Sequence, residues 1–118
     1  EHGRPAYIPH FRLLPEEAVA LIRQAGGVPV LAHPKLVRDD ELVERLLALD
    51  FGGIEVYYPQ HDAADTARYK ALAERHGMRL TGGSDFHALP HREPKELGLF
   101  TIDDTLAAPF FHPPEALE

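Results

Sequence analysis

Segments of helical character alternate with short apolar runs along this chain, and this order restricts its fold more than any single residue does. The predicted helices cover residues 15–24, 39–49 and 63–76, and the apolar runs cover residues 28–32, 54–58 and 78–81. The runs have the length and composition of buried strands. Helix and strand units that repeat at about 25-residue spacing are typical of parallel sheets, and not of a sandwich or a bundle. The sequence therefore predicts an α/β fold in which parallel strands alternate with helices.

The ends of the chain carry weaker signals. Residues 1–12 contain three helix breakers and are expected to form an extended lead-in. Residues 97–102 are a candidate fourth strand, and residues 109–118 are expected to be an irregular tail. With 118 residues, the chain has room for a single domain, residues 1–118, with one modest core.

A sheet of three or four parallel strands would leave edges and apolar surface uncovered, because parallel sheets normally have both faces covered. We therefore expect other polypeptide to complete the fold, or copies of the chain to associate through the exposed sheet edges. The first residue is Glu1 and not Met. This suggests a chain that begins inside a longer gene product or follows a removed tag or propeptide.

The composition excludes several classes of protein. The net charge of -7 provides no long-range attraction for nucleic acid or for an anionic membrane. The sequence has no cysteine, which excludes disulfides and thiolate metal sites. It also has no secretory signal pattern and no apolar run of roughly 18 residues. These features predict no membrane association, with the cytoplasm as the default location.

Potential ligands follow each predicted strand at its carboxyl end, where functional groups collect in open parallel sheets and in barrels. His33 follows the first strand, His61 follows the second, and Asp85 and His87 follow the third. A carboxylate and an imidazole together suit Zn²⁺, Mn²⁺ or Fe²⁺. Taken one at a time, each has a simpler reading: His33 as a hydrogen-bonded residue beside Pro34, and Asp85 as a turn or cap residue with His87 exposed.

The second strand carries further polar residues. Glu55 lies in an apolar run, so it must meet a cation, a metal or hydrogen-bond donors, or point away from the core, and pairing with an Arg is the simplest alternative. Tyr57 and Tyr58 are adjacent and point to opposite faces, so at least one of them is a packing residue, and neither is assigned a chemical role. His61 could bind a phosphate oxygen or a metal-bound water, or it could be a solvent-exposed loop residue.

Motifs of other phosphate and hydrolase chemistries are missing. The sequence has no Gly-Lys-Ser/Thr phosphate loop and no Gly-Xaa-Ser-Xaa-Gly elbow. Ser84 is therefore read as a turn residue. Arg4 and Arg92 are loop residues whose guanidinium groups could neutralise a substrate phosphate.

Three segments together, residues 26–34, 53–61 and 81–87, carry a resemblance to a known family. They resemble the PHP (polymerase and histidinol phosphatase) superfamily, specifically the metal-dependent phosphoesterases that include nucleotide phosphatases and 5′-to-3′ exoribonucleases. The resemblance spans roughly residues 3–98. It implies the carboxyl-terminal portion of a distorted (β/α)7 barrel.

The resemblance also implies a site and a reaction. By it, His33, Asp85 and His87 are metal ligands, and His61 lies near the substrate phosphate. Complete members hold two or three divalent ions, usually Mn²⁺, Fe²⁺ or Zn²⁺. The implied reaction is hydrolysis, by metal-activated water, of phosphate esters of small nucleotides or short oligonucleotides.

The chain departs from the family pattern in one respect. Complete members begin with a His-Xaa-His strand, and no such motif occurs here. The three ligands could at best form a site of two His and one carboxylate, so activity is expected to need the amino-terminal half of the barrel. The alternative is a non-catalytic half-barrel that serves in assembly or interaction and binds metal weakly or not at all.

Overall fold

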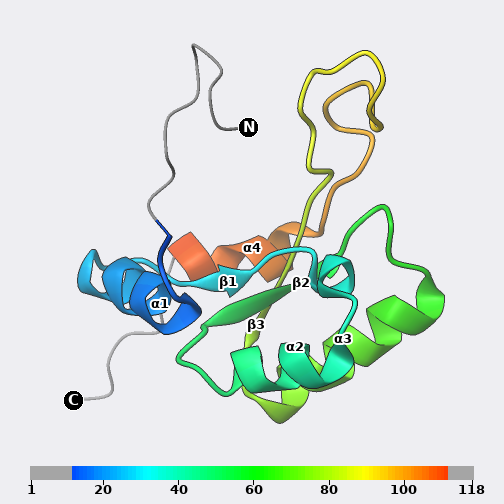
Figure 1. Ribbon diagram of the computed structural model, residues 1–118. Coiled ribbons are helices and arrows are strands. Elements are labelled where there is room, and N and C mark those ends of the chain that lie inside the picture. Colours follow the sequence, from blue (N-terminus) through cyan, green and yellow to red (C-terminus); the bar gives the residue numbers. More distant parts are fainter. Residues whose placement is uncertain (1–11, 112–118) are drawn as a thin grey trace, which may run out of the picture.

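The centre of the computed structural model, which describes residues 12–111, is a sheet of three parallel strands (Figure 1). The strands are β1 (Val30–Leu31), β2 (Gly53–Tyr57) and β3 (Arg79–Gly82), and they lie side by side in the order β1-β2-β3. Both strand pairs are parallel, with Ile54 opposite Leu31 on one side and opposite Leu80 on the other. The predicted α/β class with parallel strands is therefore confirmed.

Three helices, one before β1 and one in each connection between the strands, begin where the sequence indicates. They are α1 (Pro15–Gln24), α2 (Asp40–Leu47) and α3 (Ala63–Arg75). Asp39 caps α2, where its side chain accepts a hydrogen bond from the Leu42 N–H at 2.9 Å. Asp62 caps α3 in a reciprocal arrangement with Asp65. The short 3-10 helix η1 (Pro34–Val37), which follows β1 after Ala32 and His33, is not predicted from the sequence.

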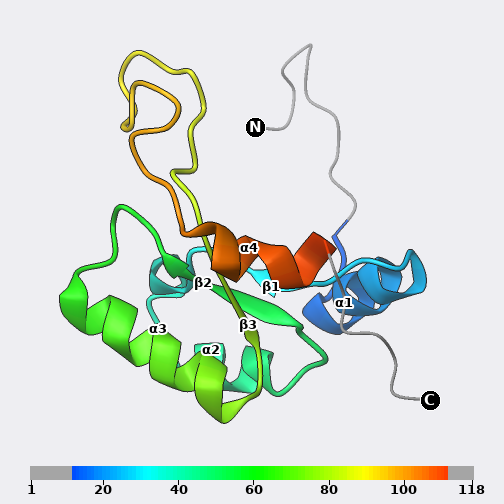
Figure 2. The same ribbon diagram turned by 180° about the vertical axis from the view of Figure 1, so that it is seen from behind.

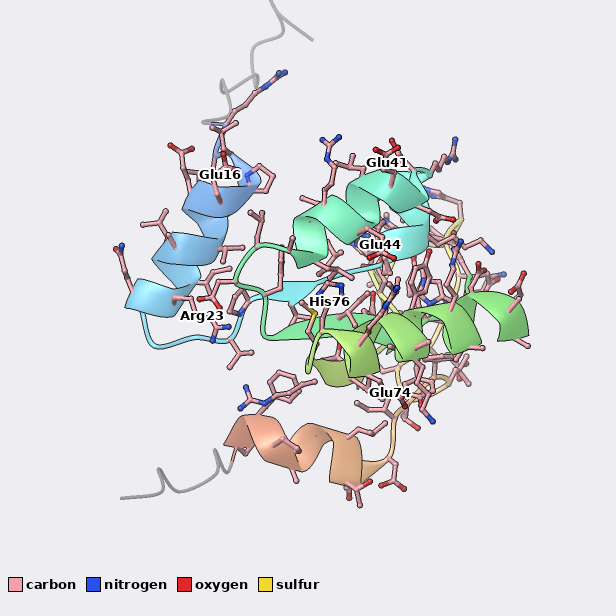
Figure 3. All side chains as sticks on the ribbon, turned by 90° about the horizontal axis from the view of Figure 1, so that it is seen from below. Glu16, Arg23, Glu41, Glu44, Glu74 and His76 are labelled. Atoms are coloured by element: carbon pink, nitrogen blue, oxygen red, sulfur yellow. The ribbon has the colours of Figure 1, made fainter. Side chains whose placement is uncertain are left out.

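The hydrophobic core lies between the sheet and the helices α2 and α3. Ile54 and Val56 of β2 are fully buried there and alternate with Glu55, whose side chain points to the other face. The helices contribute Val43, Leu47, Tyr69, Leu72 and Ala73 to the same cluster. Figure 3 shows α2 and α3 lying beside one another on this side of the sheet.

The helix α4 (Asp104–Phe111) covers the opposite face of the sheet, and it lies in front of the strands in Figure 2. The Phe110 ring lies 3.6 Å from the position that a side chain at Gly53 would occupy, and the Arg79 guanidinium stacks over that ring at 5.2 Å. The predicted irregular tail is therefore wrong for residues 109–111, because packing on the sheet holds Pro109 inside a helix. Residues 112–118 of that tail lie outside the described range.

The candidate strand at residues 97–102 is also wrong, because within the described range these residues belong to a long loop, 83–103, between β3 and α4. Gly98 has a φ of 82°, which a strand cannot accommodate, and Leu97 and Leu99 are 75% and 64% exposed. The loop extends away from the sheet in Figures 1 and 2. The lead-in predicted for residues 1–12 lies outside the described range except for Arg12, which belongs to no helix or strand.

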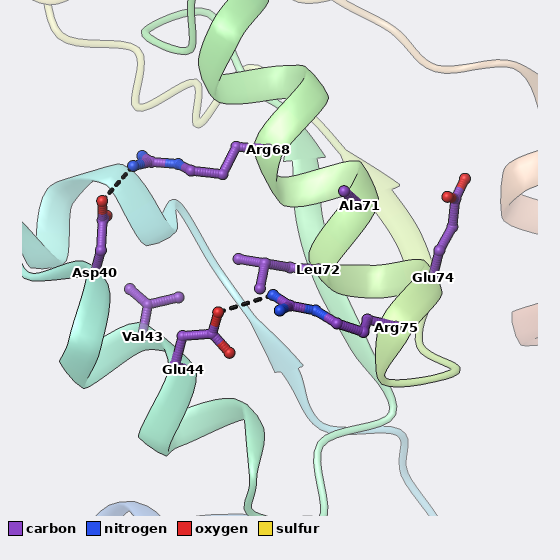
Figure 4. Close-up of a pocket in the computed structure, with 8 residues that line it drawn as sticks. All are labelled: Asp40, Val43, Glu44, Arg68, Ala71, Leu72, Glu74 and Arg75. Atoms are coloured by element: carbon purple, nitrogen blue, oxygen red, sulfur yellow. Dashed lines mark hydrogen bonds and ion pairs between the residues drawn. The ribbon is translucent and has the colours of Figure 1, made fainter.

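Ion pairs join η1, α2 and α3 on the outer side of the core. Asp65, only 9% exposed, binds Lys35 of η1 and Arg68 of its own helix. Arg68 also pairs with Asp40, and Arg75 pairs with Glu44 at 2.8 Å, so that two bridges cross the groove between α2 and α3 (Figure 4). The hydrogen bond from Lys35 holds the pKa of the Asp65 carboxyl below its usual value.

No helix within residues 12–111 has both the length and the apolar character needed to cross a bilayer.

We predict that Asp65→Asn destabilises the protein at neutral pH and that this effect disappears in acid. A carboxyl whose pKa is lowered by folding stabilises the folded state above its unfolded pKa of about 3.9, and this stability is lost as the pH falls through the lower folded-state value. Urea unfolding of both proteins at pH 7, 5 and 3 should show a difference in stability that narrows below pH 4. Glu74→Gln is the control, since Glu74 makes no ion pair within residues 12–111. A difference for Asp65→Asn that is constant with pH would contradict the assigned role of Asp65.

We also predict opposite outcomes for alanine at the paired glycines after β3. A Cβ at Gly82 would contact Ile102 and would lie 2.6 Å from the Tyr57 carbonyl oxygen, whereas a Cβ at Gly83 would lie 3.9 Å from its nearest neighbour. Gly82→Ala should lower the free energy of unfolding by about 1–3 kcal/mol, because backbone must shift to relieve the overlap. Gly83→Ala is the matched control and should have little effect. Equal losses for both variants in thermal or urea unfolding would show that the packing at β3 is not as described.

Candidate active site

Parallel pairing brings the carboxyl ends of the strands to one edge of the sheet, and the predicted ligands lie there. His33 comes two residues after β1, Tyr58 follows β2 directly, and Asp85 follows β3 after Gly83 and Ser84. The long loop 83–103 leaves the sheet at this edge (Figure 1). The geometry of each residue decides what the edge can bind.

His33 has a strained backbone that a carboxylate on the next strand holds in place. Its φ of 33° and ψ of 60° lie in the left-handed region, which is unfavourable for a residue with a side chain, and all the more so for one before a proline. The Glu55 Oε2 atom accepts a hydrogen bond from the His33 backbone N–H at 2.6 Å. Of the partners considered for Glu55, the structure shows a hydrogen-bond donor from the backbone and not an Arg.

Tyr58 lies at the centre of the site, although no chemical role is assigned to it from the sequence. Its ring is 3% exposed and lies between two imidazoles, with ring centroids 5.8 Å from His33 and 5.3 Å from His61. Burial raises the pKa of the Tyr58 phenol, and the nearby carboxylates of Asp85 and Glu55 raise it further. The signal that could have identified Tyr58 is its place directly after β2, where it faces the ends of both neighbouring strands.

Asp85 and His87 lie together at the base of the long loop. The Asp85 Oδ2 atom accepts a hydrogen bond from Arg92 at 2.7 Å, and its Oδ1 atom lies 3.5 Å from His87 Nδ1. Asp85 has a φ of 55°, so it is a second strained residue at this edge. Its carboxylate caps no helix in the described range, whereas the His87 side chain is 45% exposed, as the simpler reading expects.

His61 lies between two tyrosines and is not the solvent-exposed loop residue of the simpler reading. Its ring centroid is 4.8 Å from that of Tyr69, and its Nδ1 atom lies 2.8 Å from the Val56 carbonyl oxygen. A carbonyl only accepts, so Nδ1 carries the proton in this contact. The Nε2 atom is buried without a partner among the described residues. That nitrogen is therefore the one available to a further ligand.

The donors at this edge suit a divalent cation by their chemistry, since imidazole and carboxylate ligate Mn²⁺, Fe²⁺ and Zn²⁺. The described residues do not form a complete set of ligands. Between residues 12 and 111, no group of three or more His, Asp or Glu residues is close enough to hold a metal ion. The structure brings Asp85 and His87 together, and the ring of His33 lies beside that of Tyr58. These residues therefore fit as part of a site that needs donors from outside the described residues.

Curated relatives of the chain are named for reactions of phosphate esters. It is 41% identical to a phosphoribosyl 1,2-cyclic phosphate 1,2-diphosphodiesterase of Eggerthella lenta. The match extends over 78 residues, which make up 66% of this chain and 30% of that protein. It is also 41% identical over 92 residues to a 3′,5′-nucleoside bisphosphate phosphatase of Chromobacterium violaceum, 73% of this chain and 32% of that protein. A 5′-3′ exoribonuclease of Escherichia coli matches 72% of this chain and 31% of its own length at 32% identity. The chain thus spans about a third of the length of these relatives.

A solved structure is similar to nearly the whole chain. It is a protein of Bifidobacterium adolescentis titled as a metal-dependent phosphoesterase, with a TM-score of 0.70 and 30% identity over 94% of this chain and 40% of that one. No family model matches the sequence.

Proposed function

Because this chain belongs to the PHP-type metal-dependent phosphoesterases, as part of a longer domain, we propose that the whole protein hydrolyses phosphate esters of small nucleotides or short oligonucleotides. The relatives support this substrate class, since their names combine a phosphate ester with a ribose, a nucleoside or RNA. A cytoplasmic location belongs to the same proposal.

The observation that carries the proposal is the convergence of polar groups at one edge of the sheet. Imidazole and carboxylate groups follow all three strands, and the Tyr58 ring lies between those of His33 and His61. Two of the proposed ligands, His33 and Asp85, have strained backbones. Strain of this kind persists where the surrounding structure holds it, and it concentrates at functional sites.

In this proposal His33, Asp85 and His87 ligate Mn²⁺, Fe²⁺ or Zn²⁺ together with donors from outside the described residues. A divalent ion in such a site stabilises negative charge on a phosphoryl group and lowers the pKa of a bound water. The chain's own residues prepare the site. Glu55 holds the backbone of His33, and Arg92 neutralises Asp85.

Two side chains are candidates for the substrate phosphate. His61 has Nε2 unpartnered, and because Nδ1 already donates to Val56, the ring can donate to a phosphate oxygen only when both nitrogens carry protons. Arg92 has a side chain that is 42% exposed and a guanidinium whose fork matches phosphate geometry. Arg92 contacts the proposed ligand Asp85, whereas His61 contacts Tyr58, whose ring also lies beside that of His33.

The test is the loss of metal and activity in the complete protein after His33→Ala or Asp85→Ala. Each variant should lower Mn²⁺ affinity and phosphate release from a 3′,5′-nucleoside bisphosphate by more than about a hundredfold, because loss of a ligand exceeds the 10–100-fold effect of an outer-shell change. Elemental analysis after stripping and reloading gives the metal content. His76→Ala is the control, because His76 ends α3 and pairs with Glu44, away from this edge.

Unchanged metal content and phosphatase activity in both variants would contradict the proposal. Absence of specific metal and of activity in the complete wild-type protein would favour the alternative of a non-catalytic interaction module.

A further inference from the structure

We propose that Glu55 is a positioning residue, which acts through the backbone of His33 to aim its imidazole and does not itself bind the metal. This inference rests on the proposed function, because it assumes that His33 is a ligand. It assigns a role to a charged side chain in the middle of an otherwise apolar strand.

The first support is the hydrogen bond between Glu55 and the His33 backbone. At 2.6 Å it is short for an N–H donor, as is usual when the acceptor carries a charge. It joins the end of β1 to the middle strand β2. The His33 carbonyl oxygen is also held, because it accepts a hydrogen bond from the Leu36 N–H at 3.0 Å. The peptide groups on both sides of His33 are therefore held, and the unfavourable left-handed conformation is stabilised.

The second support is the place of Glu55 between the two loops that carry ligands. Glu55 lies opposite Thr81, at the carboxyl end of β3. Its Oε1 atom is the nearest neighbour of the empty side-chain position of Gly83, two residues before Asp85. One carboxylate thus binds the His33 loop through Oε2 and lies against the Asp85 loop through Oε1. A shift of Glu55 would change the separation of the two loops.

The third support is that the carboxylate is already engaged. Its Oε2 atom already accepts a hydrogen bond from the His33 backbone N–H. A purely structural role would stabilise the fold without affecting the metal. A positioning role predicts a change in affinity and in ligand geometry in a protein that remains folded.

The test compares Glu55→Ala, Glu55→Gln and Glu55→Asp in the complete protein. Mn²⁺ affinity is measured by calorimetry, and Co²⁺ is used as a spectroscopic probe of ligand geometry. Glu55→Ala should weaken Mn²⁺ binding by about 10–100-fold and change the visible Co²⁺ spectrum, as loss of an orienting partner does. Glu55→Gln keeps an acceptor oxygen at the same reach and should restore most of the affinity. Glu55→Asp keeps the charge but is too short, so it should behave like Glu55→Ala.

Two controls separate the possible failures. Glu74→Ala removes a carboxylate on the outer helix α3 and should leave Mn²⁺ affinity unchanged. His33→Ala tests the premise: if it binds Mn²⁺ like the wild type, the ligand assignment fails, and the role of Glu55 fails with it. If His33→Ala loses the metal while Glu55→Ala and Glu55→Asp bind normally, the inference about Glu55 is overturned and the proposed function stands.

A third result would also overturn the inference. If Glu55→Gln loses the metal as completely as Glu55→Ala, then Glu55 is itself a ligand. Should Glu55→Ala fail to fold, Glu55→Gln and Glu55→Asp still decide between these outcomes, because they differ in reach and charge and retain a polar side chain of similar size.

Discussion

The parallel pairing of β2 with both of its neighbours is the constraint on which the rest of the structure depends. Because all three strands run in the same direction, every loop that follows a strand emerges at one edge. His33, Tyr58 and Asp85 meet there although they are far apart in the sequence. An antiparallel neighbour would send one of these loops to the opposite edge, and no common site could form.

The side chains on the two faces of β2 have different roles, one in the hydrophobic core and the other at the candidate site. Ile54 and Val56 point into the core with α2 and α3, where they are fully buried. Glu55 points to the other face, where its carboxylate holds the strained backbone of His33. The alternation of a strand therefore lets one short segment support the core and the candidate site together. The described residues add no further strand beside the outer strands β1 and β3. Self-association through the free sides of these two strands stays a prediction.

The sequence predicts the order of elements well because local signals define them. Pro15, Asp39 and Asp62 mark the starts of the helices, and the apolar runs mark the strands. The wrong predictions have tertiary causes. Leu97 and Leu99 suggest a strand but belong to an exposed loop, and packing of Phe110 on the sheet keeps Pro109 helical. The candidate ligands follow the strands at one edge of the sheet, and their role as ligands stays a prediction. The central place of Tyr58 and the contact of Glu55 with a backbone N–H depend on three-dimensional packing that no local pattern records.

The central claim is that the strand-end residues form part of a metal site, and a crystal structure of the complete protein grown with Mn²⁺ tests it most directly. The account predicts anomalous difference density at coordinating distance from the side chains of His33, Asp85 or His87. It also predicts that the His33 N–H remains bonded to Glu55. Manganese bound elsewhere, with His33 and Asp85 free of it, would contradict the account.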